Sequence, residues 1–183
     1  MTEIYLIRHV QAEGNLYRVM QGHFDGAVTA LGLRQVEALA ERFRDVKLDA
    51  LYSSDLHRAR VTASAIERTH ALTLRTDPRL REINVGPWER RFFGDLLYEE
   101  PALIGTFLQQ PTAWRLDGAE TYADVTARAC AAMERTCGRY GSAERPSRSS
   151  SNTVGPSIYS LTMRSAASST ASSAGTRMPA SRW

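Results

Sequence analysis

Short apolar runs alternate with longer amphipathic segments along the first two thirds of the chain. Residues 3–8 are mostly apolar and partly β-branched, a pattern typical of a buried strand. The runs at residues 48–53 and 72–76 have the same character. Each run is short and is followed by polar or charged residues, so the pattern predicts a strand at each of these places.

Apolar positions between the predicted strands recur every three or four residues, which predicts amphipathic helices. Thr29 is a suitable N-cap for a helix that extends to about Arg44, and Ser54 or Asp55 is a suitable N-cap for the next helix. Strands and helices in alternation are typical of an α/β fold, in which a mostly parallel sheet is flanked by helices.

Two further helices are predicted after the last of these strands. Residues 98–109 have a helical pattern in which Pro101 falls within the first turn, where proline is tolerated. Thr121 followed by Asp124 resembles a capping box and marks the start of the other helix. With 183 residues, 43% of them hydrophobic and 23% charged, the chain has the size and composition of one globular domain.

The helical and strand patterns end at Ser142. The last 42 residues contain 13 serines and one acidic residue, Glu144, and they offer too little apolar surface to offset the entropy cost of ordering. Residues 1–141 carry 18 basic and 19 acidic side chains, so the net charge of +3 comes from the tail. We therefore expect a domain over residues 1–141 and a Ser/Arg-rich disordered tail over residues 142–183.

The composition also limits the partners and the compartment that we expect. The tail has no basic helix and no interleaved aromatic residues, so binding to nucleic acid or to a membrane is not expected. The first apolar run is interrupted by Arg8 and is too short for a signal peptide or a membrane span, which predicts a cytoplasmic protein. Cys130 and Cys137 have no second pair at metal-ligand spacing, so we expect reduced thiols. The oligomeric state stays open.

Three separated segments near the predicted strand ends carry side chains suited to phosphate chemistry. They are LIRHVQAEGN at residues 6–15, YSSDLHRARVTA at residues 52–63 and LREINVGPWE at residues 80–89. Taken singly, each has an ordinary interpretation, because Arg58 could be a solvated helix charge and Glu82 an exposed carboxylate.

Together, these segments closely resemble the histidine phosphatase superfamily, the phosphoglycerate-mutase-like proteins. That family opens with a strand ending in Arg-His-Gly, followed by Glu or Gln, a small hydroxyl residue, Glu and Asn. The matching residues are Arg8, His9, Gln11, Glu13 and Asn15. Val10 and Arg90 each replace a Gly that is common in the family. The runs at residues 21–35 and 118–128 also match, so the resemblance covers about residues 4–140.

The resemblance implies a fold like that of phosphoglycerate mutases and a phosphohistidine mechanism. A neutral imidazole can attack phosphorus and carry the phosphoryl group, which makes His9 the implied nucleophile. Arg8 and Arg58 would hold the phosphoryl oxygens, because guanidinium groups are planar and permanently charged. Glu82 would donate a proton to the leaving alkoxide and later take one from the attacking water.

The resemblance also implies weaker pocket residues and no metal or other cofactor. Asn15, Gln21 and Glu120 would surround the substrate, a small phosphorylated metabolite, although loop or cap hydrogen bonding explains each of them equally well. No other histidine matches a required catalytic position, and we expect His57 and His70 at the surface.

Family members carry a second catalytic histidine late in the chain, on a strand that ends in a His-Gly-Gly-like turn. This chain has no histidine after His70. When residues 147–158 are re-read one frame back, the codons allow an aliphatic run followed by Glu-His-Gly-Gly-Thr-Ile. Our hypothesis is a frameshift between about Arg139 and Ser147, which would remove the C-terminal strand and helix of the domain.

The sequence therefore predicts a phosphomonoester hydrolase that acts through phosphohistidine on a small phosphorylated metabolite. One alternative is a truncated and catalytically dead relative that at most binds phosphate through Arg8 and Arg58. Another alternative is a phosphoglycerate mutase. The mutase is disfavoured because mutases are longer and usually have Thr where Ser53 stands.

Overall fold

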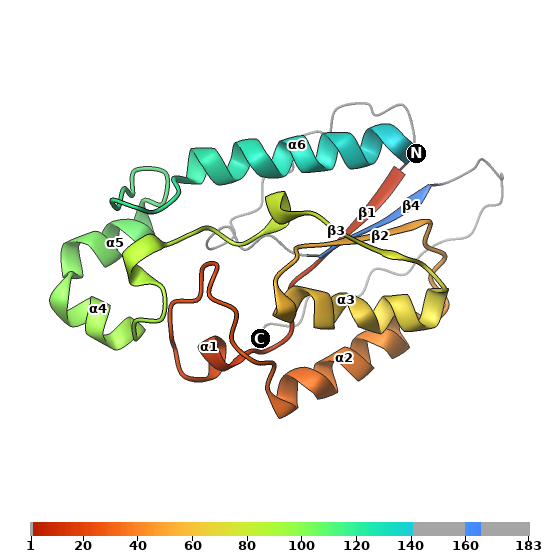
Figure 1. The fold of residues 1–183 in the computed structure, drawn as a ribbon, viewed down its shortest axis with the longest axis horizontal. Helices are drawn as coiled ribbons and strands as arrows, with labels where there is room; N and C mark the ends of the chain where they lie inside the picture. Colours follow the sequence, from red (N-terminus) through yellow and green to blue (C-terminus); the bar gives the residue numbers. More distant parts are fainter. Residues whose placement is uncertain (1, 141–159, 166–183) are drawn as a thin grey trace.

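A sheet between two helical layers forms the centre of the computed structural model, which describes residues 2–140 and 160–165 (Figure 1). Within these residues the sheet has the order β1-β4-β2-β3. The strands are β1 (Thr2–Ile7), β2 (Ala50–Ser53), β3 (Leu74–Thr76) and β4 (Ser160–Ser165). Helix α6 (Tyr122–Tyr140) covers one face of the sheet, and α2 (Ala30–Phe43) and α3 (His57–His70) cover the other.

The strand directions agree with the predicted, mostly parallel sheet. β2 and β3 are parallel, whereas β4 is antiparallel to both β1 and β2, so β1, β2 and β3 run in one direction. The three strands that the apolar runs predict are therefore present, each with ends that differ by no more than two residues from the prediction.

β4 corrects part of the prediction for the tail. It lies within residues 142–183, for which the sequence pattern predicts disorder, and its backbone pairs with β1 on one side and with β2 on the other. Ladder hydrogen bonds join main-chain groups and do not require an apolar pattern, so a Ser-rich stretch can form them. Residues 141–159 and 166–183 lie outside the described residues.

The two faces of β1 and β2 bury different side chains. Tyr5 and Leu51 face α2 and α3, where the Tyr5 ring meets the Phe43 ring edge-on at 5.4 Å between centroids. Ile4 and Ala50 instead face α6 and pack near Ala132. This alternation is the period of two expected for strands with helices on both faces.

Two of the predicted helix starts are confirmed. The Thr29 hydroxyl accepts a hydrogen bond from the Gly32 N–H at 3.0 Å, so Thr29 caps α2. Thr121 and Asp124 cap α6 reciprocally, because the Asp124 carboxylate accepts from the Thr121 N–H and the Thr121 hydroxyl accepts from the Asp124 N–H. Local spacing is sufficient in both cases because cap and acceptor lie within one turn.

The prediction of Ser54 or Asp55 as the cap of α3 is wrong. Helix α3 begins at His57, and neither side chain caps it. The Asp55 carboxylate instead pairs with Arg81, which lowers the pKa of Asp55 through hydrogen bonds and charge against the opposing effect of burial. The N–H groups of His57 and Arg58 are capped by Asp25, a residue more than 30 positions earlier.

The helix predicted at 98–109 is two helices. α4 (Phe93–Glu99) ends before Glu100, and α5 (Pro101–Gln109) begins with Pro101 in its first turn. Proline has no N–H and disfavours a helical residue before it, which explains the break. α4 and α5 form a lobe beside the sheet (Figure 1), whose core includes the contacting rings of Trp88 and Trp114.

Three short segments complete the regular structure of the described residues. They are α1 (Glu13–Leu16) and the 3₁₀ turns at Pro78–Leu80 and Gly86–Trp88. Among the described residues, no helix has both the length and the apolar character needed to cross a membrane. Cys130 on α6 is an exposed free thiol.

The start of α2 touches the loop that follows β1. The Thr29 hydroxyl donates to the Gln11 amide oxygen at 2.7 Å, and the Thr29 N–H donates to the Gln11 carbonyl oxygen at 3.1 Å. A Cβ atom on Gly32 would lie 2.2 Å from that carbonyl oxygen. Only glycine therefore allows α2 to approach this loop so closely.

We expect Gly32→Ala to lower the free energy of unfolding by about 1–3 kcal/mol, because the added methyl group overlaps the main chain. Gly105 in α5 has no atom within 4 Å of the corresponding position, so Gly105→Ala should instead raise stability by roughly 0.5–1 kcal/mol. Urea unfolding of both variants measures the difference. Equal effects of the two substitutions would contradict the close approach of α2.

Candidate active site

His9 lies two residues beyond β1 and is held by one defined hydrogen bond. Its Nδ1 atom is 2.7 Å from the carbonyl oxygen of Val10. A carbonyl oxygen can only accept, so in the neutral ring Nδ1 carries the proton and Nε2 carries the free lone pair. The imidazole is thus oriented with Nε2 unprotonated.

The surroundings of His9 keep it neutral. The pKa of His9 is lowered from 6.5 to about 4, chiefly by burial and to a smaller extent by the positive charges of Arg58 and Arg8. The hydrogen bond to Val10 and the charge of Asp25 act in the opposite direction but are weaker in sum. At neutral pH the ring is therefore uncharged, as nucleophilic attack requires.

Arg58 is buried, with 1% of its surface exposed. Its guanidinium donates to the carbonyl oxygens of Phe24 and Gly22, both at 2.8 Å, and lies 3.5 Å from the Asp25 carboxylate. Burial lowers the pKa of Arg58, while Asp25, Glu82 and Glu89 raise it. Because Arg58 is buried, it is not the solvated helix charge that the sequence left open. An arginine stays protonated in proteins, so its positive charge acts on His9.

Val10 occupies its position without backbone strain. The residues other than glycine with a positive φ, among those described, are Arg18, Ala71 and Arg90. The Val10 side chain is buried in an apolar cluster with Val36 and Ala40. Its N–H donates to the Thr62 hydroxyl at 2.9 Å, and that hydroxyl donates to the Arg58 carbonyl oxygen at 2.7 Å. The loop carrying His9 is thereby joined to α3.

Arg8 and Glu82 complete the group of residues for which the sequence predicts the main chemistry. Arg8 follows β1 directly, is exposed, and acts electrostatically on His9. The Glu82 carboxylate acts in the same way on Arg58, and it assists burial in raising the pKa of Tyr122 to about 12. Arg8 and Arg58 thus act electrostatically on His9, and Glu82 acts electrostatically on Arg58.

Arg128 is a residue of this region to which the sequence analysis assigned no role. Its guanidinium donates to the carbonyl oxygens of Arg79, Arg81 and Glu82 at 2.9, 2.6 and 2.8 Å. It also forms two hydrogen bonds with the Glu120 carboxylate, each at 2.8 Å. One side chain on α6 therefore fixes the loop on which Glu82 lies.

The α6 pattern does contain a sign of this role. Val125 and Ala132 form the buried stripe of the helix, and Arg128 lies between them at helical spacing. A charged residue on an apolar stripe must find partners in the interior. The pattern could have indicated a buried ion pair, although it does not identify the partners.

The Glu120 carboxylate joins Arg128 to the main chain at Asn84. Burial acts to raise its pKa, but hydrogen bonds from Arg128 and from the Asn84 N–H lower it overall, so the carboxylate is ionised. His23 lies 3.9 Å away and donates through Nε2 to the Glu82 carbonyl oxygen at 2.9 Å. Glu120 and His23 thus lie beside Glu82.

Asn15 and Gln21 differ in their hydrogen bonding. The Asn15 side-chain oxygen accepts from the Ala12 N–H at 3.0 Å, which is the cap interaction that the sequence left open for it. The Gln21 side-chain oxygen is buried without a hydrogen-bond partner among the described residues, and it packs against Gly14. A polar group in this condition indicates a missing partner at this place.

Besides His9 and His23, the described residues contain two histidines, His57 and His70. His57 and His70 are at the two ends of α3, and His57 is exposed as expected. His70 is partly buried, with its ring 2.8 Å from the Val46 carbonyl oxygen. The described residues contain no histidine after His70.

Comparison with known proteins identifies relatives over most of the described chain. Residues 4–144 match the family model of the histidine phosphatase superfamily, branch 1. The curated relatives include proteins named probable phosphoglycerate mutase GpmB, from Proteus mirabilis and Yersinia pestis. Both are 34% identical over 73% of this chain. The chain spans 62% of the length of each of these relatives.

Several solved structures, among them two proteins named as phosphatases, are also similar. YhfR of Bacillus stearothermophilus has a TM-score of 0.72 at 30% identity, covering 76% of this chain and 68% of its own. A mycobacterial glucosyl-3-phosphoglycerate phosphatase, solved with VO3, has a TM-score of 0.70 at 30% identity, covering 75% and 65%. An α-ribazole phosphatase from Shigella flexneri has a TM-score of 0.67 at 26% identity, covering 76% and 68%.

We expect the lowered pKa of His9 to make stability depend on pH. Between pH 6.5 and about 4 the unfolded chain binds a proton at His9 that the folded chain does not, so folding weakens as the pH falls through this range. The His9→Gln variant lacks this effect. Its free energy of unfolding, relative to that of the parent, should therefore rise by an amount on the order of 2 kcal/mol as the pH falls from 6.5 to about 4. Urea unfolding at several pH values measures it, and a constant difference would contradict the burial of His9.

Proposed function

The chain belongs to the histidine phosphatase superfamily, and on that premise we propose that its site hydrolyses phosphomonoesters of small metabolites through a phosphohistidine at His9. One observation carries this proposal: His9 is neutral, its Nδ1 is hydrogen-bonded to Val10, and its free Nε2 belongs to a ring on which the positive charges of Arg58 and Arg8 act. A lone pair next to fixed positive charge is the arrangement that attack on a phosphoryl group needs.

The first step transfers the phosphoryl group to the protein. The Nε2 lone pair of His9 forms a bond to phosphorus while the bond from phosphorus to the ester oxygen breaks. Glu82, in its protonated form, gives its proton to the leaving oxygen, so an alcohol departs. Arg8 and Arg58 stabilise the charge on the non-bridging oxygens.

The second step restores the enzyme. Glu82 takes a proton from water as the water oxygen attacks phosphorus and the bond from phosphorus to Nε2 breaks. Inorganic phosphate leaves, His9 becomes neutral again and Glu82 is again protonated, which balances the cycle. Gln21 can contribute to substrate binding in another way, because its side-chain oxygen has no partner among the described residues and, as an acceptor, can take a hydrogen bond from a substrate hydroxyl.

Two other functions have specific support. The curated relatives are named probable phosphoglycerate mutases, which favours a mutase in which a second substrate hydroxyl replaces water. The absence of any histidine after His70 in the sequence favours a catalytically dead relative that binds phosphate. Hydrolysis remains the first choice because the solved relatives include phosphatases and because Ser53 stands where mutases usually have Thr.

We expect a phosphorylated protein to form when the chain is mixed with radiolabelled 4-nitrophenyl phosphate. The label should be acid-labile and base-stable, as a phosphorus–nitrogen bond is, and should be absent from His9→Ala. His70→Ala is the matched control, because it removes an imidazole from the far end of α3 and should keep the label.

The outcomes separate the functions. Label on His9 with release of phosphate into water supports the hydrolase, whereas transfer only to a second phosphoglycerate molecule supports the mutase. Phosphate binding without label or turnover supports the dead relative. Label that persists in His9→Ala would refute the assignment of the nucleophile.

We also propose that a frameshift between about Arg139 and Ser147 removed the second catalytic histidine. The surroundings of β1 support this proposal. A cavity of about 440 Å³ lies along the strand, lined by Ile4–Arg8 and by Leu39, Arg42 and Phe43, and Leu6 is 61% exposed. An apolar strand with open space beside it is where a further element would pack.

We expect the gene to contain one base too many or too few in this interval. A frame-restored chain should supply a strand and a His-Gly-Gly turn together, and it should hydrolyse phosphomonoesters at least about a hundredfold faster, on the scale of one preorganised donor. Nucleotide sequencing and steady-state kinetics test this. A gene with no route to His-Gly-Gly, or equal rates, would refute the frameshift.

A further inference from the structure

Arg90 has a backbone conformation that side chains other than glycine rarely adopt. Its φ is +68°, in the left-handed region, at the place where the family commonly has glycine. Its N–H donates to the Met20 carbonyl oxygen at 2.8 Å, which fixes the turn in this conformation. Strain of this kind persists when the surroundings impose it, and it concentrates at sites of function.

The guanidinium of Arg90 has an aromatic partner but no anionic one. Its Cζ atom lies 5.1 Å from the centre of the Phe24 ring, and no carboxylate pairs with it among the described residues. The next residue differs, because Arg91 pairs with both Glu99 and Glu100. Arg90 is exposed, and its charge lies over the Phe24 ring without a counter-ion among the described residues.

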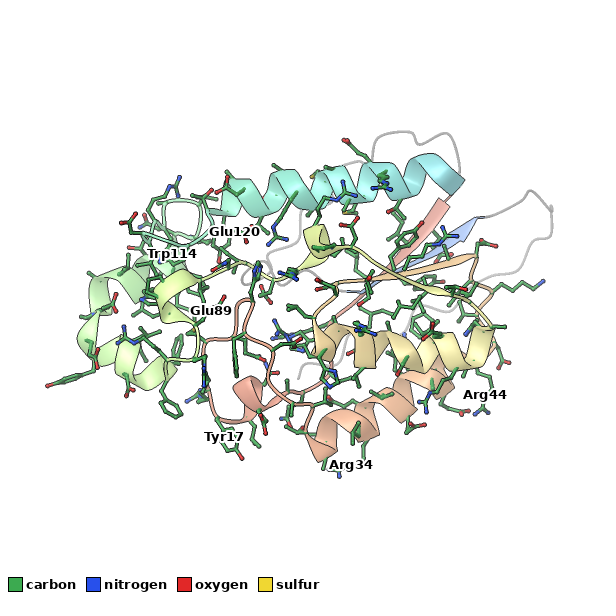
Figure 2. The ribbon with its side chains drawn as sticks, in the orientation of Figure 1. Tyr17, Arg34, Arg44, Glu89, Trp114 and Glu120 are labelled. Atoms are coloured by element: carbon green, nitrogen blue, oxygen red, sulfur yellow. The ribbon has the colours of Figure 1, made fainter. Side chains whose placement is uncertain are left out.

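Two links place Arg90 at the margin of the active site. The Phe24 ring lies against the Arg90 guanidinium, and the Phe24 carbonyl oxygen accepts a hydrogen bond from the buried Arg58. The neighbouring Glu89 accepts from the His23 N–H at 2.7 Å, and its charge acts on Arg58. Figure 2 labels Glu89 between the sheet layers and the α4–α5 lobe.

We propose that Arg90 binds an anionic group of the substrate other than the phosphoryl group that is transferred. Arg8 and Arg58 serve the phosphoryl oxygens, and a third cation, fixed on Phe24 at the margin of the same site, serves a second anion. The substrate class is then a phosphomonoester that carries a carboxylate or another phosphate. The inference rests on the proposed function, because it requires a phosphoryl site at His9.

Binding of phosphonates, which cannot be hydrolysed, tests Arg90 independently of turnover. Isothermal titration would compare 4-phosphonobutanoate, its primary amide and butane-1,4-bisphosphonate, with inorganic phosphate as the probe of the phosphoryl site. The parent should bind the carboxylate or the bisphosphonate roughly tenfold more tightly than the amide, as one charge-assisted pair implies. The tighter of the two identifies the second anion.

Arg90→Gly and Arg90→Gln should lose this preference, while inorganic phosphate binds as in the parent. Arg90→Lys should keep part of it, since the charge remains. Arg34→Gln, which removes an exposed charge at the N-terminal end of α2 (Figure 2), is the matched control and should keep all of it. The melting temperature of Arg90→Gly should equal or exceed that of the parent, because glycine adopts this φ freely.

The possible failures are distinguishable. If inorganic phosphate binds to the parent but the anionic phosphonates show no preference over the amide, the inference about Arg90 is wrong and the proposed function stands. A preference that survives in Arg90→Gly also refutes the inference. If the parent binds neither inorganic phosphate nor any phosphonate, both the proposed function and the inference fail.

Discussion

The buried charge of Arg58 is the constraint on which the rest of the site depends. A guanidinium in the interior must be hydrogen-bonded, because an unpaired buried charge costs several kcal/mol. The chain between Gly22 and Asp25 supplies that pairing with two carbonyl oxygens and a carboxylate. The same carboxylate caps α3, so the loop, the start of the helix and the field around His9 form one unit.

A second guanidinium, that of Arg128, positions the loop of Glu82, the residue that we propose as the proton donor. Arg128 reaches from α6 to three carbonyl oxygens ending with that of Glu82, and Glu120 balances its charge. α3 and α6 lie on opposite faces of the sheet (Figure 1), and each sends one arginine to a loop: Arg58 to the loop of Gly22 and Asp25, and Arg128 to the loop of Glu82. The loops of this site are therefore positioned by side chains of the helical scaffold, as precise placement of reacting groups requires.

The sheet and the site differ in how much they demand of the sequence. β4 completes ladders with β1 and β2 although it comes from a Ser-rich segment, because main-chain pairing accepts nearly any residue that can extend. Phosphoryl transfer, in contrast, depends on particular side chains, so other residues cannot take their places. A chain can thus keep the architecture of the family while its catalytic set stays incomplete, and fold alone does not establish activity.

The sequence by itself determined the elements whose causes are local. The strands at residues 3–8 and 48–53, the Thr29 and Thr121 caps, and the motif residues His9, Arg58 and Glu82 could all be identified from spacing or family resemblance. The tertiary structure decided whatever depends on partners far along the chain: the capping of α3 by Asp25, the grip of Arg128 on the Glu82 loop, the strained turn at Arg90 and the position of β4. Periodicity records which face of an element is buried, whereas the partner that a buried charge or an open strand edge finds is fixed only when the chain has folded.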